Sequence, residues 1–160
     1  MTTRGHSYPV LEGEDIPSLR VAESGWAEGG LLEARAGQAE FQILRETIKA
    51  GLPWAAFERL KDALEVSVAE LCALTGIAQR TLNRRKDQPF TPDESEKLLR
   101  FGRIYQKALE TLESPEGARR WLKAPKTALG GLTPLVCTDT EAGAREVEAL
   151  LHRLEYGVFS

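Results

Sequence analysis

The stretch that decides the fold is Ser67-Val-Ala-Glu-Leu-Cys-Ala-Leu-Thr-Gly-Ile-Ala-Gln-Arg-Thr-Leu-Asn-Arg-Arg-Lys86. Ser67 and Glu70 have the spacing of a capping box, in which each side chain accepts a hydrogen bond from the backbone N–H of the other residue. Gly76 predicts the end of this first helix, because glycine readily adopts the left-handed backbone of a turn. The stretch is therefore predicted to be a helix-turn-helix, in a helical protein that works by binding rather than by catalysis.

Apolar residues on both sides of Gly76 predict how the two helices pack. Leu71 and Leu74 fall on the buried face of the first helix, and the small Cys72 stands where the two helices would cross closely. Ile77 can bury just after the turn, and Leu82 faces back toward the first helix. The second helix, expected from about Ala78 to Lys86, then turns its polar side chains outward.

These polar side chains are of the kind that reads DNA. Arginine pairs with guanine edges in the major groove, and glutamine and asparagine pair with adenine. Residues 79–86 carry four positive charges and no negative one, in a chain whose 21 Lys and Arg against 24 Asp and Glu give a net charge of −3. The alternative is a solvated basic helix without a ligand. We expect base contacts from Gln79, Arg80, Thr81, Asn83 and Arg84, and phosphate contacts from Arg85 and Lys86, in a homodimer on a pseudo-palindromic operator.

Upstream of this motif, the helical pattern begins near Gln38. Phe41, Leu44 and Ile48 share one face of a helix that Gly51 is expected to end. A second apolar stripe follows, and we interpret it as core rather than as an exposed partner surface: Trp54, Phe57, Leu60 and Leu64. Residues 1–38 are interrupted by many glycines and prolines and are expected to form a poorly ordered arm.

Downstream, Thr91-Pro-Asp-Glu94 predicts a helix start with a capping box and proline at the first position. That helix can run to about Leu112, which makes it ~30 Å long and the spine of the fold. Ser114-Pro115 begins a shorter helix that Pro125 ends, and residues 126–137 are expected to be a loop. Thr138 and Glu141 predict another capping box, followed by a last helix that stops around Tyr156-Gly157.

The composition argues against several other classes of protein. No apolar run approaches the ~20 residues of a membrane helix, and the first residues lack a secretory signal, so we expect a cytoplasmic protein without membrane contact. Cys72 and Cys137 are isolated, and His6 and His152 are lone histidines. The sequence contains no HExxH, GxSxG, GxxxxGK[ST] or GxGxxG motif, so we expect no enzyme activity, cofactor or metal.

From residue 40 onward the chain resembles the Xre/MbcA/ParS-type antitoxins that accompany RES-domain toxins. The resemblance rests on Leu71-Cys-Ala-Leu-Thr-Gly-Ile77 and Thr81-Leu-Asn-Arg-Arg85, on the long helix that follows, and on Trp121-Leu122. It continues through Leu129-Gly-Gly-Leu-Thr-Pro-Leu135 and a threonine-initiated helix that contains Gly143, Val147 and Leu151. The ordered combination is far more specific than the helix-turn-helix alone.

The resemblance implies an all-α protein with an Xre-like helix-turn-helix domain followed by a small helical toxin-binding domain. We expect the arm over residues 1–38, the DNA-binding and dimerisation domain over 39–113, and the toxin-binding domain over 114–160. The resemblance also implies a role: to neutralise a co-expressed RES toxin, which degrades NAD or transfers its ADP-ribose, and to repress the shared operon.

The last residues of the chain are the expected toxin contact. A chain end is usually frayed and polar, but Tyr156, Val158, Phe159 and Ser160 are mostly apolar, which suggests that another surface covers them. We expect this tail to enter or cover the active-site cleft of the toxin.

Two other functions remain open at this stage. The first is a stand-alone helix-turn-helix regulator whose C-terminal half only dimerises. The second is a small enzyme or NAD-binding accessory protein, which the missing motifs disfavour. A RES-domain gene beside this one distinguishes the antitoxin from the stand-alone regulator.

Overall fold

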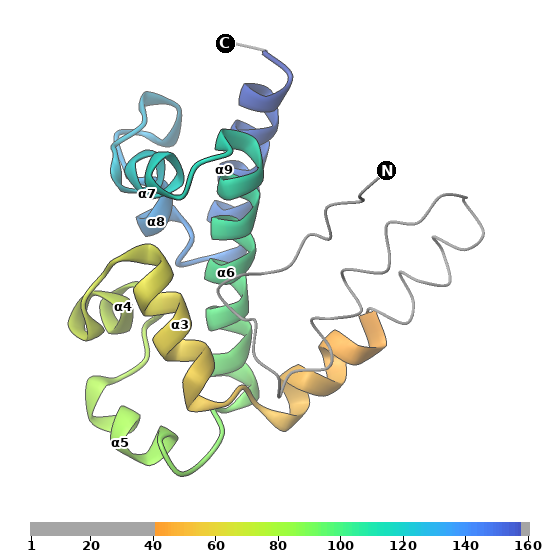
Figure 1. Cartoon of the computed structure of the whole chain (residues 1–160), viewed down its shortest axis with the longest axis vertical. Coiled ribbons are helices and arrows are strands. Elements are labelled where there is room, and N and C mark those ends of the chain that lie inside the picture. Colours follow the sequence, from red (N-terminus) through yellow and green to blue (C-terminus); the bar gives the residue numbers. More distant parts are fainter. Residues whose placement is uncertain (1–40, 158–160) are drawn as a thin grey trace.

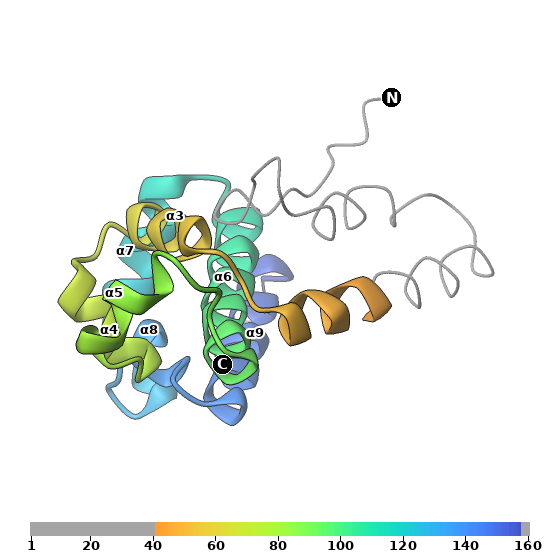
Figure 2. The same cartoon turned by 90° about the horizontal axis from the view of Figure 1, so that it is seen from below.

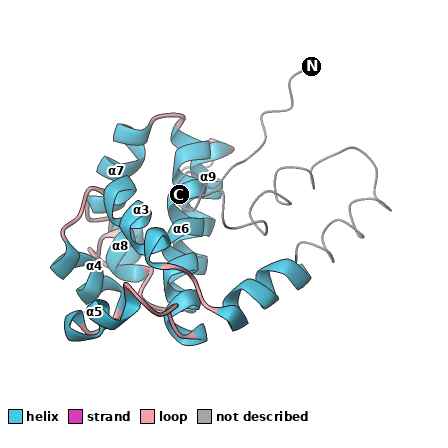
Figure 3. Ribbon diagram, turned by 60° about the horizontal axis from the view of Figure 1, so that its bottom comes forward, coloured by secondary structure: helices cyan, strands magenta, loops and turns pink. Residues whose placement is uncertain are grey.

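The computed structural model describes residues 41–157, and within this range the chain forms helices and turns but no strand (Figure 3). The prediction of an all-α fold is thereby confirmed for the described residues. The predicted arm over residues 1–38 lies outside this range, as do Val158, Phe159 and Ser160 of the predicted tail.

The longest described helix, α6 (Pro92–Leu112), stands in the centre of the fold with α9 (Glu141–Glu155) alongside it (Figure 1). It begins at the predicted capping box. The N–H of Glu94 donates to Thr91 Oγ1 over 3.2 Å, and the N–H of Thr91 donates to Glu94 Oε2 over 2.9 Å. The start of this helix was predictable because local residues set it, and the helix ends at the expected Leu112, followed by Glu113 with a φ of 53°.

The elements that precede α6 gather near its N-terminal half (Figure 1). A helix over residues 41–50 ends at Gly51, whose φ is 88°. Then follow α3 (Trp54–Leu64), α4 (Val68–Thr75), the 3-10 turn η1 (Gln79–Thr81) and α5 (Leu82–Arg85). The single helix expected over 78–86 is thus a 3-10 turn followed by one turn of α-helix.

The elements that follow α6 cover its C-terminal half. They are α7 (Pro115–Lys123), η2 (Thr127–Leu129), α8 (Pro134–Cys137) and α9. The loop predicted over 126–137 therefore contains two short helices. The N–H of Val136 donates to Thr133 Oγ1 over 3.2 Å, so a capped turn begins here with Pro134 in its first position.

The capping box predicted for Thr138 and Glu141 is wrong. The last helix is capped by Thr140, whose hydroxyl accepts from the N–H of Gly143 over 3.0 Å. Thr138 is fully buried instead, and its hydroxyl donates to the carbonyl of Pro134 over 2.8 Å. Arg100 of α6 holds this turn through its Nε, which donates to the carbonyl of Thr138 over 2.9 Å.

Three of the four residues in the apolar stripe of α3 are core, as predicted, and Trp54 at its start is half-buried. Phe57, Leu60 and Leu64 are fully buried. The ring of Phe57 stacks on that of Phe90 at a centroid distance of 5.9 Å, and Phe90 leads from the helix-turn-helix into α6. The view from below shows these elements packed on one side of α6 (Figure 2).

The apolar stripe predicted on the helix over residues 41–50 is more exposed than the stripe of α3. The helix over residues 41–50 projects from the body in both views (Figures 1 and 2). Phe41 is 60% exposed and Leu44 is 40% exposed, whereas Ile48 is half-buried. The spacing of these residues correctly predicted a helix but does not make this face part of the core.

Basic side chains of α7 tie the C-terminal elements to the end of α3. Lys123 Nζ donates to the carbonyl of Glu65 over 2.8 Å, and Arg119 donates to the carbonyl of Ala63 over 3.3 Å. Cations at the C-terminus of a helix stabilise its unpaired carbonyls. Among the described residues, no helix is both long and apolar enough to cross a membrane.

Candidate functional site

The turn between α4 and α5 has the geometry that the sequence predicts. Ser67 and Glu70 form the capping box, with N···O distances of 3.1 Å and 2.7 Å. Gly76 has a φ of 73°, in the left-handed region that favours glycine. Next to it, Thr75 Oγ1 donates to the carbonyl of Leu71 over 2.7 Å and accepts from the N–H of Ile77 over 3.4 Å. Backbone and side chain together therefore close the turn.

The predicted burial is confirmed for four of the five apolar residues of the two helices, and Leu74 is only half-buried. Leu71 is fully buried, Cys72 is 7% exposed, and Ile77 and Leu82 are each 4% exposed. Burial raises the pKa of the Cys72 thiol, which therefore stays protonated and acts as a small apolar side chain. These contacts leave the opposite side of η1 and α5 in solvent.

Most of the predicted DNA-contacting side chains lie on that solvent side. Gln79, Arg80, Asn83, Arg84 and Lys86 are exposed, and Thr81 is half-buried. Within residues 41–157, Arg80 and Arg84 have no carboxylate partner. Three cations and two amides therefore lie exposed on one short segment.

Arg85 differs from the prediction, because its side chain does not lie on the solvent side. Its guanidinium turns inward, where Nε donates to Glu94 Oε2 over 2.8 Å and the second nitrogen donates to Oε1 over 3.1 Å. Only 12% of the Arg85 side chain is exposed. The guanidinium is occupied by this carboxylate, and the phosphate contact expected for Arg85 is withdrawn.

Lys86, the other predicted phosphate contact, remains at the surface. Its Nζ lies 5.7 Å from the ring centroid of Trp54, at cation–π distance. Trp54 in turn stacks on Phe57 with a centroid distance of 5.2 Å. The end of the basic segment is thus supported by the aromatic cluster, while Lys86 as a whole stays exposed.

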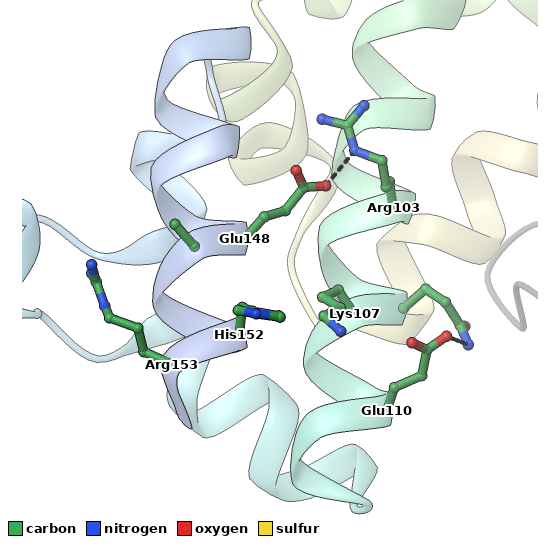
Figure 4. Close-up of a pocket in the computed structure, with 8 residues that line it drawn as sticks. Arg103, Lys107, Glu110, Glu148, His152 and Arg153 are labelled. Carbon is green, nitrogen blue, oxygen red and sulfur yellow. Dashed lines mark hydrogen bonds and ion pairs between the residues drawn. The ribbon is translucent and has the colours of Figure 1, made fainter. Parts of the chain in front are cut away.

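An open pocket of about 550 Å³ lies between α6 and α9 and runs along the two helices. Arg103 Nε donates to Glu148 Oε1 over 2.7 Å, and its other arm donates to Glu141 over 2.9 Å. Figure 4 shows Glu148 reaching across from α9 to Arg103, with His152 and Lys107 between the same helices. The residues that line the pocket are Arg103, Gln106, Lys107, Glu110, Glu148, Ala149, His152 and Arg153.

The charges of this pocket hold α9 in place rather than forming an open anion site. Lys107 Nζ donates to Glu155 over 2.8 Å, in addition to the contacts of Arg103. The hydrogen bond and the charge of Lys107 hold the pKa of Glu155 below its ordinary value. Two cations of α6 are therefore neutralised by three carboxylates of α9, from its first turn to its last.

The predicted toxin contact begins where α9 ends. Tyr156 is the C-cap of α9 and is 67% exposed, and its ring packs on His152 at a centroid distance of 4.5 Å. Gly157 follows with a φ of 67°, so the backbone turns away from the helix. Tyr156 is thus the one predicted tail contact that falls within the described residues.

Sequence reasoning missed one exposed apolar pair in the C-terminal half. Leu132 is 51% exposed and Val136 is 43% exposed, on either side of the cap of α8. They follow Gly130 and Gly131, whose φ values of 66° and 84° lie in the left-handed region that favours glycine. The spacing of the pair by four residues across a Thr-Pro helix start was the available signal.

Comparisons with known proteins identify both halves. Residues 44–103 match the family of the antitoxin Xre-like helix-turn-helix domain, and residues 107–157 match that of the antitoxin Xre/MbcA/ParS C-terminal toxin-binding domain. The two matches meet within α6.

Whole-chain relatives agree with these matches. An "Antitoxin Xre" of Yersinia enterocolitica is 36% identical over 138 residues, covering 84% of this chain and 90% of the relative. An "Antitoxin Xre" of Photorhabdus laumondii is 31% identical, covering 73% and 81%. A "Prs ADP-ribosylating antitoxin" of Sphingobium sp. is 26% identical, covering 71% and 78%. The chain therefore belongs to the Xre/MbcA/ParS antitoxins, a family of non-enzymatic proteins with a helix-turn-helix domain and a C-terminal toxin-binding domain.

Proposed function

We propose that this antitoxin neutralises a RES-domain toxin that consumes NAD or transfers its ADP-ribose. The observation that carries the proposal is the match of residues 107–157 to a toxin-binding domain. Support for the chemistry of the partner comes from the relative in Sphingobium, whose name refers to ADP-ribosylation. The resemblance of the Trp121-Leu122 and Gly-Gly-Leu-Thr-Pro segments to antitoxins of RES toxins favours the RES class.

The tail over residues 156–160 is proposed to cover the active site of that toxin. The ion pairs between α6 and α9 hold the helix from which the tail leaves, so that the tail starts from a fixed point. Preorganisation of this kind lowers the entropy cost of binding. Tyr156, exposed at that point, is an aromatic anchor of the type that is common at binding hot spots.

The helix-turn-helix is proposed to repress the antitoxin's own operon as a homodimer. The segment over residues 79–86 offers arginine and amide groups that match guanine and adenine edges. Dimers of this motif place their two reading segments one helical turn of DNA apart, about 34–36 Å. We propose that Gln79, Arg80, Thr81, Asn83 and Arg84 contact bases and that Lys86 contacts a phosphate.

Co-expression with the product of the adjacent gene tests the toxin assignment. We expect the toxin alone to arrest growth, the pair to grow, and the two proteins to co-purify as a complex whose mass light scattering measures. Growth arrest that the antitoxin does not relieve would contradict the assignment. In that case the chain would be better described as a stand-alone regulator.

Replacing Arg80 and Arg84 with alanine tests the DNA assignment. Loss of one bidentate base contact costs about 1–3 kcal/mol, so the double variant should bind its own promoter at least about tenfold more weakly. The measurement is a binding titration at physiological salt. A matched control replaces Arg120 and Arg145, two exposed arginines of α7 and α9, and should leave DNA affinity unchanged. Wild-type affinity of the Arg80/Arg84 variant would refute the assignment.

A further inference from the structure

The inward-facing pair of Arg85 and Glu94 connects two helices that follow each other in the sequence across a short loop. Arg85 is the last residue of α5, and Glu94 lies in the first turn of α6. Both guanidinium–carboxylate hydrogen bonds are formed, at 2.8 Å and 3.1 Å, and the two side chains are only 12% and 15% exposed. Bidentate geometry of this kind fixes the orientation of the two groups as well as their distance.

The same carboxylate also completes the cap of α6. Glu94 Oε2 accepts from the N–H of Thr91 over 2.9 Å while it accepts from Arg85 Nε. Burial raises the pKa of Glu94, but the hydrogen bonds from Arg85 and Thr91 outweigh this effect and lower the pKa below its ordinary value of 4.5. Glu94 is therefore ionised at neutral pH and keeps both contacts.

The short helix α5 needs such a support. It has four residues, and one turn of helix is not stable by itself. Leu82 anchors its first residue in the core. Without Arg85, the other end would be held by the contact of Lys86 with Trp54 and by backbone hydrogen bonds, in which the N–H groups of Asp87 and Gln88 donate to the carbonyl of Arg84.

We propose that Arg85 and Glu94 form a positioning latch that sets the angle at which α5 presents Asn83 and Arg84 to DNA, without either residue contacting DNA. This inference rests on the proposed DNA-binding role of the segment. It assigns Arg85 a different role from that of the exposed Arg80 and Arg84, although the sequence alone does not distinguish the three arginines. It also makes Glu94 a determinant of DNA affinity, although an acidic residue would ordinarily oppose that affinity.

Glu94→Gln tests the latch, because this substitution should break the ion pair with Arg85 while it keeps the helix cap with Thr91. Glutamine can still accept from the N–H of Thr91, as it does in natural capping boxes, but it loses the charge that holds Arg85. Simple electrostatics predicts tighter DNA binding when a negative charge is removed near the surface. The latch predicts the opposite: affinity for a duplex from the protein's own promoter should fall about tenfold, a size typical of coupling between contacting residues.

Arg85→Ala supplies an independent measurement. If Arg85 only positions α5, this variant also loses affinity, but the slope of log affinity against log salt stays at the wild-type value. A lost phosphate contact would instead reduce that slope by about 0.9. The double variant Arg85→Ala/Glu94→Gln should bind no more weakly than either single variant, because both break the same unit. Arg85→Lys, which keeps one charged contact, should recover part of the affinity.

The controls separate the possible failures. All variants should still bind the toxin, and their melting temperatures show whether the fold is retained. Wild-type affinity of Glu94→Gln, tighter binding by it, or a reduced salt slope of Arg85→Ala would overturn the latch alone. If the wild-type protein does not prefer its promoter to a scrambled duplex, both the DNA-binding role and the latch are overturned.

Discussion

Replacing Gly143 with alanine should destabilise the protein by about 3 kcal/mol or more, the upper range for an overpacked site. A Cβ at this position would lie 1.8 Å from the carbonyl oxygen of Cys137 and 2.8 Å from its carbonyl carbon. These are backbone atoms and cannot move aside as a flexible side chain can. Arg100 further fixes the turn by donating to the carbonyls of Thr138 and Asp139. Thermal unfolding followed by circular dichroism should show a drop in Tm of about 10 °C.

Gly117 provides a matched control for this substitution. Like Gly143, it donates its N–H to the hydroxyl of the residue that caps its helix, in this case Ser114 over 3.1 Å. A Cβ there would meet only side-chain atoms, Ser114 at 3.3 Å and Leu112 at 3.9 Å, among its nearest neighbours. Alanine is favoured over glycine in a helix by up to about 1 kcal/mol. Gly117→Ala should therefore melt close to the wild type. Equal melting temperatures for the two variants would contradict the role assigned to Gly143.

Deletion of Tyr156–Ser160 should abolish neutralisation of the toxin while leaving DNA binding unchanged. The deletion removes the proposed cover of the toxin's active site but spares the contacts that hold α9. The buried residues of α9, Ala144, Val147 and Leu151, remain in the shortened protein, and so does the ion pair of Lys107 with Glu155. The shortened protein should fold, bind its promoter and fail to restore growth in cells that express the toxin.

A single substitution distinguishes the side chain from the length of the tail. Phe159→Asp keeps the full chain but places a charge on the proposed contact, which should weaken neutralisation strongly because an unpaired charge at an interface is costly. The promoter titration and the melting temperature serve as controls, and both should match the wild type. Full protection of cells by the truncated form would refute the tail mechanism.

The parts of the fold that were predictable are those encoded by neighbouring residues. The caps at Ser67 and Thr91 depend on glutamates three residues away, and the turns at Gly51 and Gly76 depend on the glycine itself. Such features need no knowledge of the rest of the chain. The stripe of α3 was predictable for a similar reason, because the spacing of its apolar residues places them on one face of the helix, and such a face usually packs against the core.

The parts that were not predictable depend on residues far apart in the sequence. Thr138 and Thr140 are equally good caps by composition, and the choice between them depends on the burial of Thr138 and on its contact with Arg100, 38 residues away. The inward turn of Arg85 depends on Glu94, which sequence reasoning assigned only to a cap. The exposure of Phe41 has the same origin: no neighbouring residue reveals whether the tertiary structure places another element against that face.

The position of α6 bears on how such antitoxins can be recombined. The matched families divide the chain between residues 103 and 107, in the middle of this helix and beside the buried Phe101, Ile104 and Tyr105. A chimera joined there would take one half of α6 from each parent protein. The buried residues of the two halves would then not be matched to each other in the shared core. Exchange of toxin specificity between paralogues should therefore succeed only when α6 and its contacts with α3, α7 and α9 are inherited as a unit.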